Sequence, residues 1–421
     1  MPSLIAEFPV EWVPISILIR KRMTVSTPLN IASPLHLVDP IDVDKPAYWE
    51  DPTSLTFRGA AMLGVPVEKF ANWRWQMRHQ CQALEDLQAY LALSPSEQEG
   101  LTESQALFRT GVTPYYAALI AQTDPALQEA LRLQVIPRKE EMSDALGMED
   151  PLYEVDHSPV REVVHVYPDR VAFCVAMLCP VYCRYCYRKR RDEETGLHFN
   201  RQIIDRGIAY IASQPSIRDV LITGGDPLIA SDGAIEELLQ RLRSIPHVEI
   251  IRIHTRTPVA LPYRITTELV EMIQRYHPVW LNTHFNSALE LTPEAKHAIE
   301  LLVNHGIPVG NQSVFLRGVN DTVEKMHDLC RTLVRFRVRP YYLFHPHLVA
   351  GTAHLRPSVE TGLAIMKGLR GKLSGLAIPT YVLDTPSGKV PLTHNHVLGK
   401  EGKDLLLEDL HGEIWREKGA W

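Results

Sequence analysis

From about residue 170 to residue 383, short β-branched runs alternate with amphipathic stretches of helical period, and this alternation most constrains the fold. Strands that alternate with helices predict parallel β-strands joined by right-handed crossovers. Strands are expected at 170–177, 219–223, 248–254, 279–284, 308–313, 338–344 and 379–383, and helices at 202–212, 234–242, 267–275, 293–304, 323–336 and 359–369. The number of repeats favours an α/β fold with a closed or partial (β/α) barrel over an open doubly wound sheet. In such barrels the chemistry lies at the C-terminal ends of the strands.

The rest of the chain divides around this barrel. Residues 1–45 are rich in proline, lack a clear period and are expected to form an N-terminal arm. We expect a helical region at 46–160, the barrel at 161–390 and a C-terminal tail at 391–421. Within the helical region, a helix over 102–120 is expected to be interrupted at Pro114. At 421 residues and 45% hydrophobic, the chain can bury a barrel-sized core and a smaller one.

Charge and hydropathy argue against several classes of protein. A formal net charge of −6 disfavours a general nucleic-acid binder, and no apolar run reaches the roughly 18 residues that span a bilayer. The apolar stretch at 8–19 is followed by basic residues, whereas a secretory signal has basic residues in front. Six cysteines in so long a chain do not make a disulfide framework. We therefore expect a cytoplasmic protein with no membrane or nucleic-acid partner.

Cys179, Cys183 and Cys186 follow the first predicted strand with the spacing C-x3-C-x2-C. Three thiolates on one loop can hold three irons of a [4Fe–4S] cluster, whereas electron-transfer clusters are normally closed by four cysteines. The remaining open iron suggests that a small molecule binds there. Zinc is the alternative, but zinc usually takes four ligands and no fourth cysteine lies nearby. The spacing resembles that of the radical SAM superfamily, which implies S-adenosylmethionine at the open iron.

Further candidate residues end later strands. Gly224, Gly225 and Asp226 come directly after the second predicted strand. Glycines there let the backbone approach a ligand closely, and exposed backbone groups could bind the ammonium group of S-adenosylmethionine, although a simple tight turn is the alternative. His284 and Gln312 end two further strands and could face the same cavity.

Lys389 lies on a loop with glycine and proline after the last predicted strand. A lysine held in a cavity can lose its proton and bind an aldehyde cofactor covalently. A loop lysine is more often solvated surface, so this residue type alone does not decide between the two interpretations.

From about residue 49 to residue 408, the chain resembles lysine 2,3-aminomutase and its relatives. The resemblance includes the cysteine motif and runs in one order through 72–76, 113–116, 167–171, 283–286, 310–313, 317–321 and 337–342. It implies an isomerase with three cofactors: a [4Fe–4S] cluster, S-adenosylmethionine and pyridoxal phosphate. The implied reaction moves the α-amino group of an L-amino acid, first of all L-lysine, from C2 to C3. It also implies an external one-electron donor of the flavodoxin or ferredoxin type and a homo-oligomer.

The resemblance assigns roles by position. Lys389 matches the lysine that holds pyridoxal phosphate. Arg170 matches a residue near the phosphate of that cofactor, and Tyr167 is a second contact. Gln312 matches a residue that contacts S-adenosylmethionine. Arg188 matches the arginine that binds the substrate carboxylate, a task that suits a planar guanidinium because it can donate two parallel hydrogen bonds.

One position of the implied substrate pocket departs from the resemblance. In the lysine enzymes two aspartates bind the distal ammonium group; Asp384 matches one of them, but His347 stands where the other is expected. The loss of one carboxylate leaves lysine as the first candidate substrate, arginine as the second and glutamate as the third. The other interpretation is a shifted register in which His347 points away.

One further expectation concerns a structural metal, and two alternatives concern the function. The structural zinc of clostridial relatives is not expected, because Thr322 replaces its first cysteine and no cysteine follows Cys330. One alternative function is a lysine enzyme that serves the modification of translation elongation factor P. Another is a non-catalytic iron–sulfur or pyridoxal-phosphate sensor, which would produce no β-amino acid.

Overall fold

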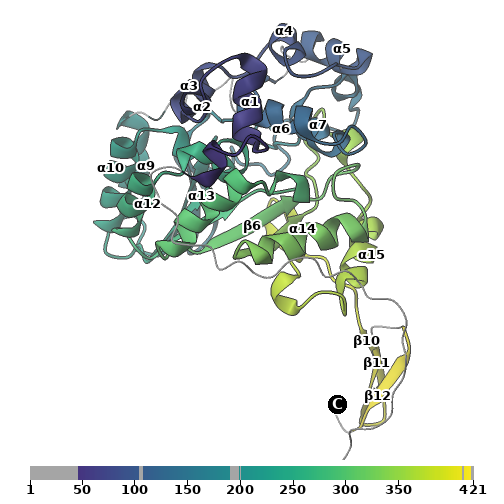
Figure 1. The fold of residues 1–421 in the computed structure, drawn as a ribbon. Coiled ribbons are helices and arrows are strands. Elements are labelled where there is room, and N and C mark those ends of the chain that lie inside the picture. Colours follow the sequence, from purple (N-terminus) through teal and green to yellow (C-terminus); the bar gives the residue numbers. More distant parts are fainter. Residues whose placement is uncertain (1–45, 104–107, 190–198, 200, 410–411, 419–421) are drawn as a thin grey trace, which may run out of the picture. The chain divides into compact units, whose positions relative to one another are not determined.

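The computed structural model describes residues 46–103, 108–189, 199, 201–409 and 412–418 (Figure 1). The arm predicted for 1–45 lies outside these residues. The predicted boundaries at 160 and 390 stay predictions.

A sheet of nine strands forms the core of the molecule, with the strands in sequence order from β1 to β9. The strands from β2 to β8 run parallel, and β1 and β9 pair antiparallel at the two edges. Their bounds are β1 Val163–Tyr167, β2 Arg170–Ala176, β3 Asp219–Gly224, β4 Ile250–His254, β5 Val279–Thr283, β6 Val309–Val314, β7 Val338–Phe344, β8 Thr380–Thr385 and β9 Gly388–Pro391. The predicted α/β fold with a partial (β/α) barrel is confirmed, and the predicted strands all form.

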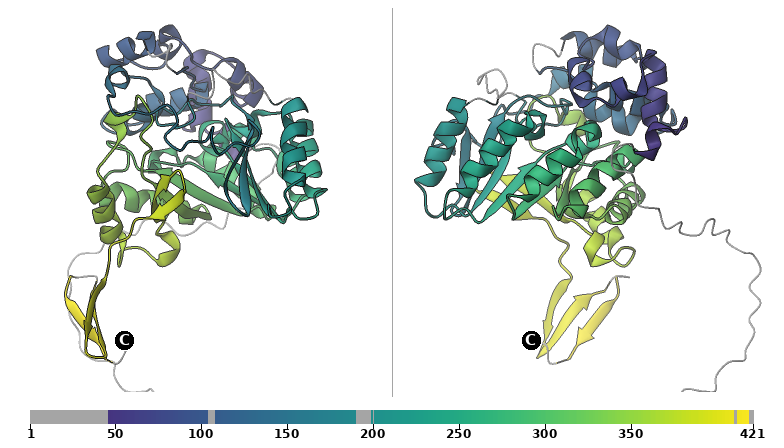
Figure 2. Two further views of the ribbon diagram at one scale, coloured as in Figure 1. Left: turned by 180° about the vertical axis from the view of Figure 1, so that it is seen from behind. Right: turned by 60° about the vertical axis from the view of Figure 1, so that its left-hand side comes forward.

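Six helices connect the parallel strands and lie on the outer side of the sheet (Figure 2). They are α9 Arg201–Ala212, α10 Asp232–Arg243, α12 Thr267–Gln274, α13 Pro293–Asn304, α14 Val323–Arg335 and α15 Val359–Leu369. In α14 the buried residues are Met326, Leu329, Cys330 and Leu333, which is the spacing of one helix face, and Thr322 caps its N-terminus. The helices expected from the sequence period are therefore confirmed.

A side-chain contact joins the two edge strands of the sheet. The backbone N–H of Lys389 on β9 donates a hydrogen bond of 2.8 Å to the hydroxyl of Tyr167 on β1. Gly388 has a positive φ of 127°, and a Cβ there would lie 2.9 Å from the same hydroxyl. Only glycine fits this close approach. The contact brings Lys389, from the end of the barrel, beside the strand that begins it.

Short helices make up the region before the sheet (Figure 1). They are α1 Leu55–Leu63, α2 Val67–Phe70, α3 Trp73–Arg78, α4 Leu84–Gln88, α5 Pro95–Glu103, α6 Pro114–Gln122 and α7 Glu129–Val135. The helix predicted over 102–120 with an interruption at Pro114 is wrong. Pro114 begins α6, because the first turn of a helix does not need its missing N–H, and Thr113 caps that turn. Residues 104–107 lie outside the described chain.

Shorter helical turns lie between the main elements. They are η1 Ala47–Trp49, η3 Lys139–Ser143, η4 Pro227–Ile229, α11 Thr257–Ala260, η5 Pro262–Arg264, η6 Ala288–Glu290, η7 Ala353–Leu355 and η8 Gly375–Ala377.

The helical region holds the loop that carries the cysteines. Gln80 donates from its side-chain amide to the carbonyl oxygens of Cys179 and Pro180, both at 2.8 Å. Arg184, between the second and third cysteines, is fully buried and donates to both carboxylate oxygens of Glu141 at 2.8 and 2.6 Å. The loop is thus fixed by groups that precede the barrel in the chain.

The C-terminal segment forms a second, three-stranded antiparallel sheet with the order β10-β11-β12. Its strands are β10 Val397–Glu401, β11 Asp404–Glu408 and β12 Ile414–Glu417. Glu408 of this sheet binds Lys367 of α15 and His394. Across the described residues, no helix is both long and apolar enough to cross a membrane.

The buried Arg184–Glu141 pair predicts a stability difference. Glu141→Ala should lower the free energy of unfolding by about 3–5 kcal/mol, because it leaves the Arg184 charge buried without its partner. Glu300→Ala is the matched control, since Glu300 pairs with Lys296 at a solvent-accessible position and should cost roughly 0–1 kcal/mol. Urea unfolding of both variants measures the difference, and equal losses would contradict it.

Candidate active site

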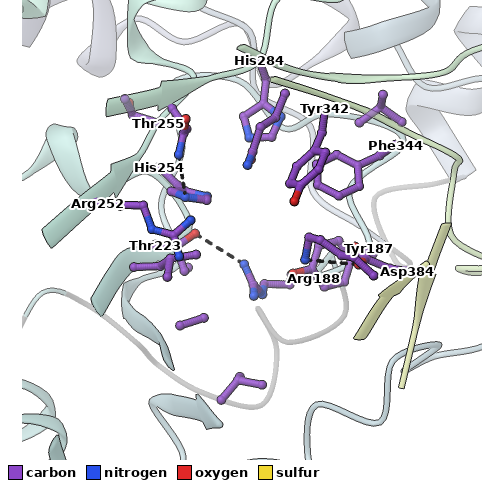
Figure 3. A pocket seen from close by; sticks show the side chains of 18 of the residues that line it. Tyr187, Arg188, Thr223, Arg252, His254, Thr255, His284, Tyr342, Phe344 and Asp384 are labelled. Atoms are coloured by element: carbon purple, nitrogen blue, oxygen red, sulfur yellow. Dashed lines mark hydrogen bonds and ion pairs between the residues drawn. The ribbon is translucent and has the colours of Figure 1, made fainter. Parts of the chain in front are cut away.

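One cavity of about 740 Å³ runs along the inner face of the sheet and reaches the C-terminal ends of the parallel strands (Figure 3). This volume is in the range of sites for small molecules and cofactors. Every site residue expected from the sequence lines it: Tyr167, Arg170, Cys179, Cys183, Cys186, Arg188, Gly224, Gly225, Asp226, His284, Gln312, His347, Asp384 and Lys389. Residues that are more than 200 positions apart in the chain thus line one cavity. Most of them lie at the C-terminal ends of the parallel strands, where barrel enzymes carry their chemistry, whereas Arg170 begins β2.

The three cysteines lie on the loop after β2, and none of them is in a disulfide. The thiol of Cys183 accepts a hydrogen bond of 2.8 Å from the guanidinium of Arg256. Burial, with the neighbouring Cys183, raises the pKa of the Cys186 thiol to about 11. Among the described residues, no three His, Cys, Asp or Glu side chains are arranged around a single metal ion. Ligands of a cluster bind different irons, so they need not converge on one point.

Gly224, which ends β3, and Gly225, which follows it, are both required by close contacts of the backbone. Gly224 has a φ of 116°, and a Cβ there would come within 2.3 Å of the carbonyl oxygen of Ala176. A Cβ on Gly225 would lie 2.5 Å from the carbonyl oxygen of Leu178. Both clashes involve the backbone that leads into the cysteine loop, so the glycines allow β3 to pack against that loop. This explains them without a ligand.

Asp226, which follows the two glycines, connects the end of β3 to the residues directly after β4. Its carboxylate accepts hydrogen bonds from the Thr255 hydroxyl at 2.6 Å and from the backbone N–H groups of Arg256 and Leu228 at 2.8 and 3.1 Å. Burial raises the pKa of Asp226, although these hydrogen bonds oppose the shift. Asp226 lines the cavity, and its oxygens are engaged inside the protein.

Asp384 on β8 joins two of the other predicted residues. One carboxylate oxygen lies 3.2 Å from Nζ of Lys389, and the other lies 3.2 Å from Nε2 of His347. Burial alone would raise the pKa of Asp384, but the hydrogen bond with His347 and the charge of Lys389 lower it below its ordinary value. The interpretation in which His347 points away is therefore wrong, because the imidazole lies within the site.

Arg188 is held by a carboxylate that the sequence did not single out. Glu154 accepts hydrogen bonds from Nη2 of Arg188 at 2.6 Å and from Nε at 3.1 Å, and it also accepts one from the Tyr187 hydroxyl at 3.2 Å. Nη1 of Arg188 lies 3.4 Å from the hydroxyl of Thr223 (Figure 3). Burial would lower the pKa of Arg188, but Glu154 raises it well above its ordinary value. Arg188 is therefore charged.

Two histidines of the cavity wall are neutral at pH 7. Burial and the charge of Arg256 lower the pKa of His284 to about 4. Burial and the charge of Arg252 lower the pKa of His254 well below its ordinary value. Both side chains face the cavity from the ends of neighbouring strands (Figure 3). Arg252 and His254 are two positions apart on β4, so strand alternation alone could have placed both on the inner face.

Tyr167, Arg170 and Gln312 complete the set of predicted residues. The guanidinium carbon of Arg170 lies 3.6 Å from the centre of the Tyr167 ring, a cation–π contact. The Nζ of Lys389 lies 5.9 Å from the same ring. Gln312 is buried on β6 and lines the cavity.

The lowered pKa of Asp384 predicts a pH dependence of stability. A carboxylate with a depressed pKa in the folded state adds stability above its unfolded pKa, and that stability is lost as the pH falls through the folded value. Below about pH 4, ligand-free wild type should therefore lose thermal stability relative to Asp384→Asn. Melting temperatures of both proteins between pH 7 and pH 3 measure this, and parallel curves would contradict it.

Residues 175–330 match the model of the radical SAM superfamily. The L-lysine 2,3-aminomutase of Bacillus subtilis is 46% identical over 83% of this chain and 74% of that protein. The enzyme of the same name from Clostridium subterminale is 45% identical over 82% of this chain and 83% of that protein. The glutamate 2,3-aminomutase of Clostridioides difficile is 39% identical over 84% of each. The predicted resemblance is confirmed, and this chain belongs to the L-lysine 2,3-aminomutase family of radical SAM enzymes.

Proposed function

We propose that this chain is an L-lysine 2,3-aminomutase that moves the α-amino group of free L-lysine to C3 and yields a β-amino acid. One observation carries the proposal: the cysteine loop, Arg188, Asp384 and Lys389 line one cavity. A non-catalytic sensor would not need a carboxylate site, an ammonium site and a reactive lysine together.

The family uses a [4Fe–4S] cluster, S-adenosylmethionine and pyridoxal phosphate, and the residues present fit these groups. Cys179, Cys183 and Cys186 would hold the cluster. The Nε–H of Arg256, which is buried beside Cys183, has no partner in the described chain. Because buried donors are rarely left unpaired, an acceptor that arrives with a cofactor suits this position. When bound, the cluster and S-adenosylmethionine supply a radical, and pyridoxal phosphate supplies the carbon that carries the migrating nitrogen.

The other cofactor assignments rest on position in the cavity. Lys389 would bind pyridoxal phosphate covalently, with Tyr167 and Arg170 beside it. For S-adenosylmethionine we assign a second group of lining residues: Gly224, Gly225, Asp226, His284 and Gln312.

Arg188 would bind the carboxylate of the substrate. Glu154 occupies the Nε and Nη2 side of the guanidinium. The donors on the outer side, between Nη1 and Nη2, can pair with a second carboxylate in a bidentate geometry. Glu154 would fix the orientation of the fork before substrate arrives, which lowers the entropy lost on binding.

Asp384 would bind the distal ammonium group. Nζ of Lys389 contacts one carboxylate oxygen of Asp384, and His347 contacts the other. The ammonium group of the substrate would take the place of Nζ on the first oxygen. A compact ammonium can use one oxygen, whereas a guanidinium binds best through two. A substrate carboxylate at this end would be repelled by Asp384. The arrangement therefore supports lysine over arginine and over glutamate.

We further propose a cytoplasmic homo-oligomer that takes one electron from a flavodoxin or ferredoxin. Thiolates that hold a cluster suit a reducing compartment. The oligomer and the donor are carried over from the family alone.

The test is an anaerobic assay of the reconstituted enzyme with dithionite and S-adenosylmethionine. Lysine, arginine, glutamate, ornithine and aspartate are offered together, and mass spectrometry after chromatography separates the α- and β-isomers. We expect β-lysine as the main product. Cleavage of S-adenosylmethionine without formation of β-lysine would contradict the assignment of lysine as substrate. If a different β-amino acid forms, its α-isomer would be the substrate instead.

His347→Asp should improve the binding of lysine. A second carboxylate beside Asp384 should lower KM for lysine about tenfold, which corresponds to ~1.4 kcal/mol and lies near the strength of one charge-assisted hydrogen bond. His345→Asn is the matched control, because His345 bonds the Tyr381 hydroxyl at 2.8 Å and lies outside the cavity lining. An unchanged KM in His347→Asp would show that this end of the cavity does not hold the ammonium.

Lys389→Ala should abolish the absorbance of covalently bound pyridoxal phosphate and leave the iron content unchanged. Cys183→Ala should have the reverse effect, because the thiolate and the amine bind different groups. Absorbance spectra and iron analysis of the reconstituted variants measure both. Retention of the pyridoxal phosphate absorbance in Lys389→Ala would assign the cofactor to another lysine, and Lys372→Ala serves as the surface control.

A further inference from the structure

We propose that Arg256 sets the reduction potential of the cluster by donating a charge-assisted hydrogen bond to the sulfur of Cys183, and that Gln134 of the helical region holds it in place. This inference rests on one part of the proposed function, namely that the three cysteines hold the cluster. It does not depend on the identity of the substrate.

The guanidinium of Arg256 lies between the cysteine loop and two other elements. Nη1 donates to the sulfur of Cys183 at 2.8 Å. Nη2 donates to the side-chain oxygen of Gln134 at 2.6 Å and to the carboxylate of Glu290 at 2.8 Å. Gln134 belongs to α7 and Glu290 to η6, so groups from outside the cysteine loop and outside β4 fix the direction of the guanidinium.

The surroundings of Arg256 hold the side chain in a buried and fixed position. The residue is 6% exposed. Its guanidinium carbon lies 5.5 Å from the ring centre of Tyr185 and 5.7 Å from that of Tyr116. The Tyr116 hydroxyl donates to Glu290 at 2.7 Å, and the backbone N–H of Arg256 itself donates to Asp226 at 2.8 Å. A side chain fixed on so many sides cannot swing away from Cys183 at little cost.

The geometry determines the sign of the effect. Reduction adds one negative charge to the cluster and its thiolates, so a fixed positive charge and a hydrogen bond to a ligand sulfur stabilise the reduced state. Hydrogen bonds to cluster sulfurs are among the known determinants of the potential. Glu290 offsets part of the charge, but it contacts Nη2 and leaves Nη1 to the sulfur. Arg256 therefore makes the cluster easier to reduce.

The test is a redox titration of the reconstituted holoenzyme followed by electron paramagnetic resonance. Arg256→Gln keeps a donor but removes the charge, and it should shift the midpoint potential to more negative values. We expect at least a tenfold fall in the equilibrium constant for reduction, which is about 59 mV for one electron. Arg256→Lys keeps the charge and should give a smaller shift in the same direction.

Arg264→Gln is the matched control. Arg264 is also fully buried, but it donates to the carbonyl oxygens of Leu228 and Ala230 and to Asp232. This variant should lose stability and keep the wild-type potential. An unchanged potential in Arg256→Gln with normal iron content would overturn the inference, because Arg256 would then be structural.

Three further outcomes decide between the inference and the proposed function or keep the test decisive. If Arg256→Gln does not fold, Arg256→Lys decides, and a wild-type potential in that variant would also overturn it. If wild type incorporates no cluster, the assignment of the cysteines fails. A lack of β-lysine with a normal cluster would affect the substrate alone.

Discussion

The pairing of buried arginines with carboxylates outside the strands is the interaction on which the site depends. Arg184 pairs with Glu141, Arg188 with Glu154 and Arg256 with Glu290. A buried charge without a partner is costly, so each arginine fixes the position of the segment that supplies its carboxylate. The cysteine loop is thereby held from several directions. The region before the sheet, which supplies Glu141 and Glu154, is consequently part of the site.

The open interior of the barrel distinguishes this fold from a barrel filled with apolar side chains. Positions that would carry branched apolar residues in a closed barrel carry Arg252, His254, Asn282 and His284 instead. Burial and neighbouring charges lower the pKa values of the two histidines, which remain neutral, and Glu154 raises the pKa of Arg188, which remains charged. Such a lumen places charged side chains in partly buried positions, where electrostatic interactions are stronger than in bulk water.

The strands and the helices of the barrel could be predicted because their local period matches their burial. The cysteine loop and the ends of the strands could be placed for the same reason. Glu154 and Arg256 could not be identified as site residues from the sequence, since both lie among other charged residues. Their roles depend on long-range contacts, with Arg188 and with Cys183, that only the fold creates. The prediction at Pro114 is wrong because a proline that begins a helix and one that interrupts a helix look alike locally. The three-stranded C-terminal sheet was likewise expected only as a tail.

The central claim is that one cavity holds the cluster, pyridoxal phosphate and the amino acid. A crystal structure of the reconstituted enzyme with lysine, recorded at the iron absorption edge, tests it most directly. We expect anomalous density beside Cys179, Cys183 and Cys186, and density for pyridoxal phosphate continuous with Lys389 in the same cavity. Iron at another position, or pyridoxal phosphate bound to another lysine, would contradict this assignment.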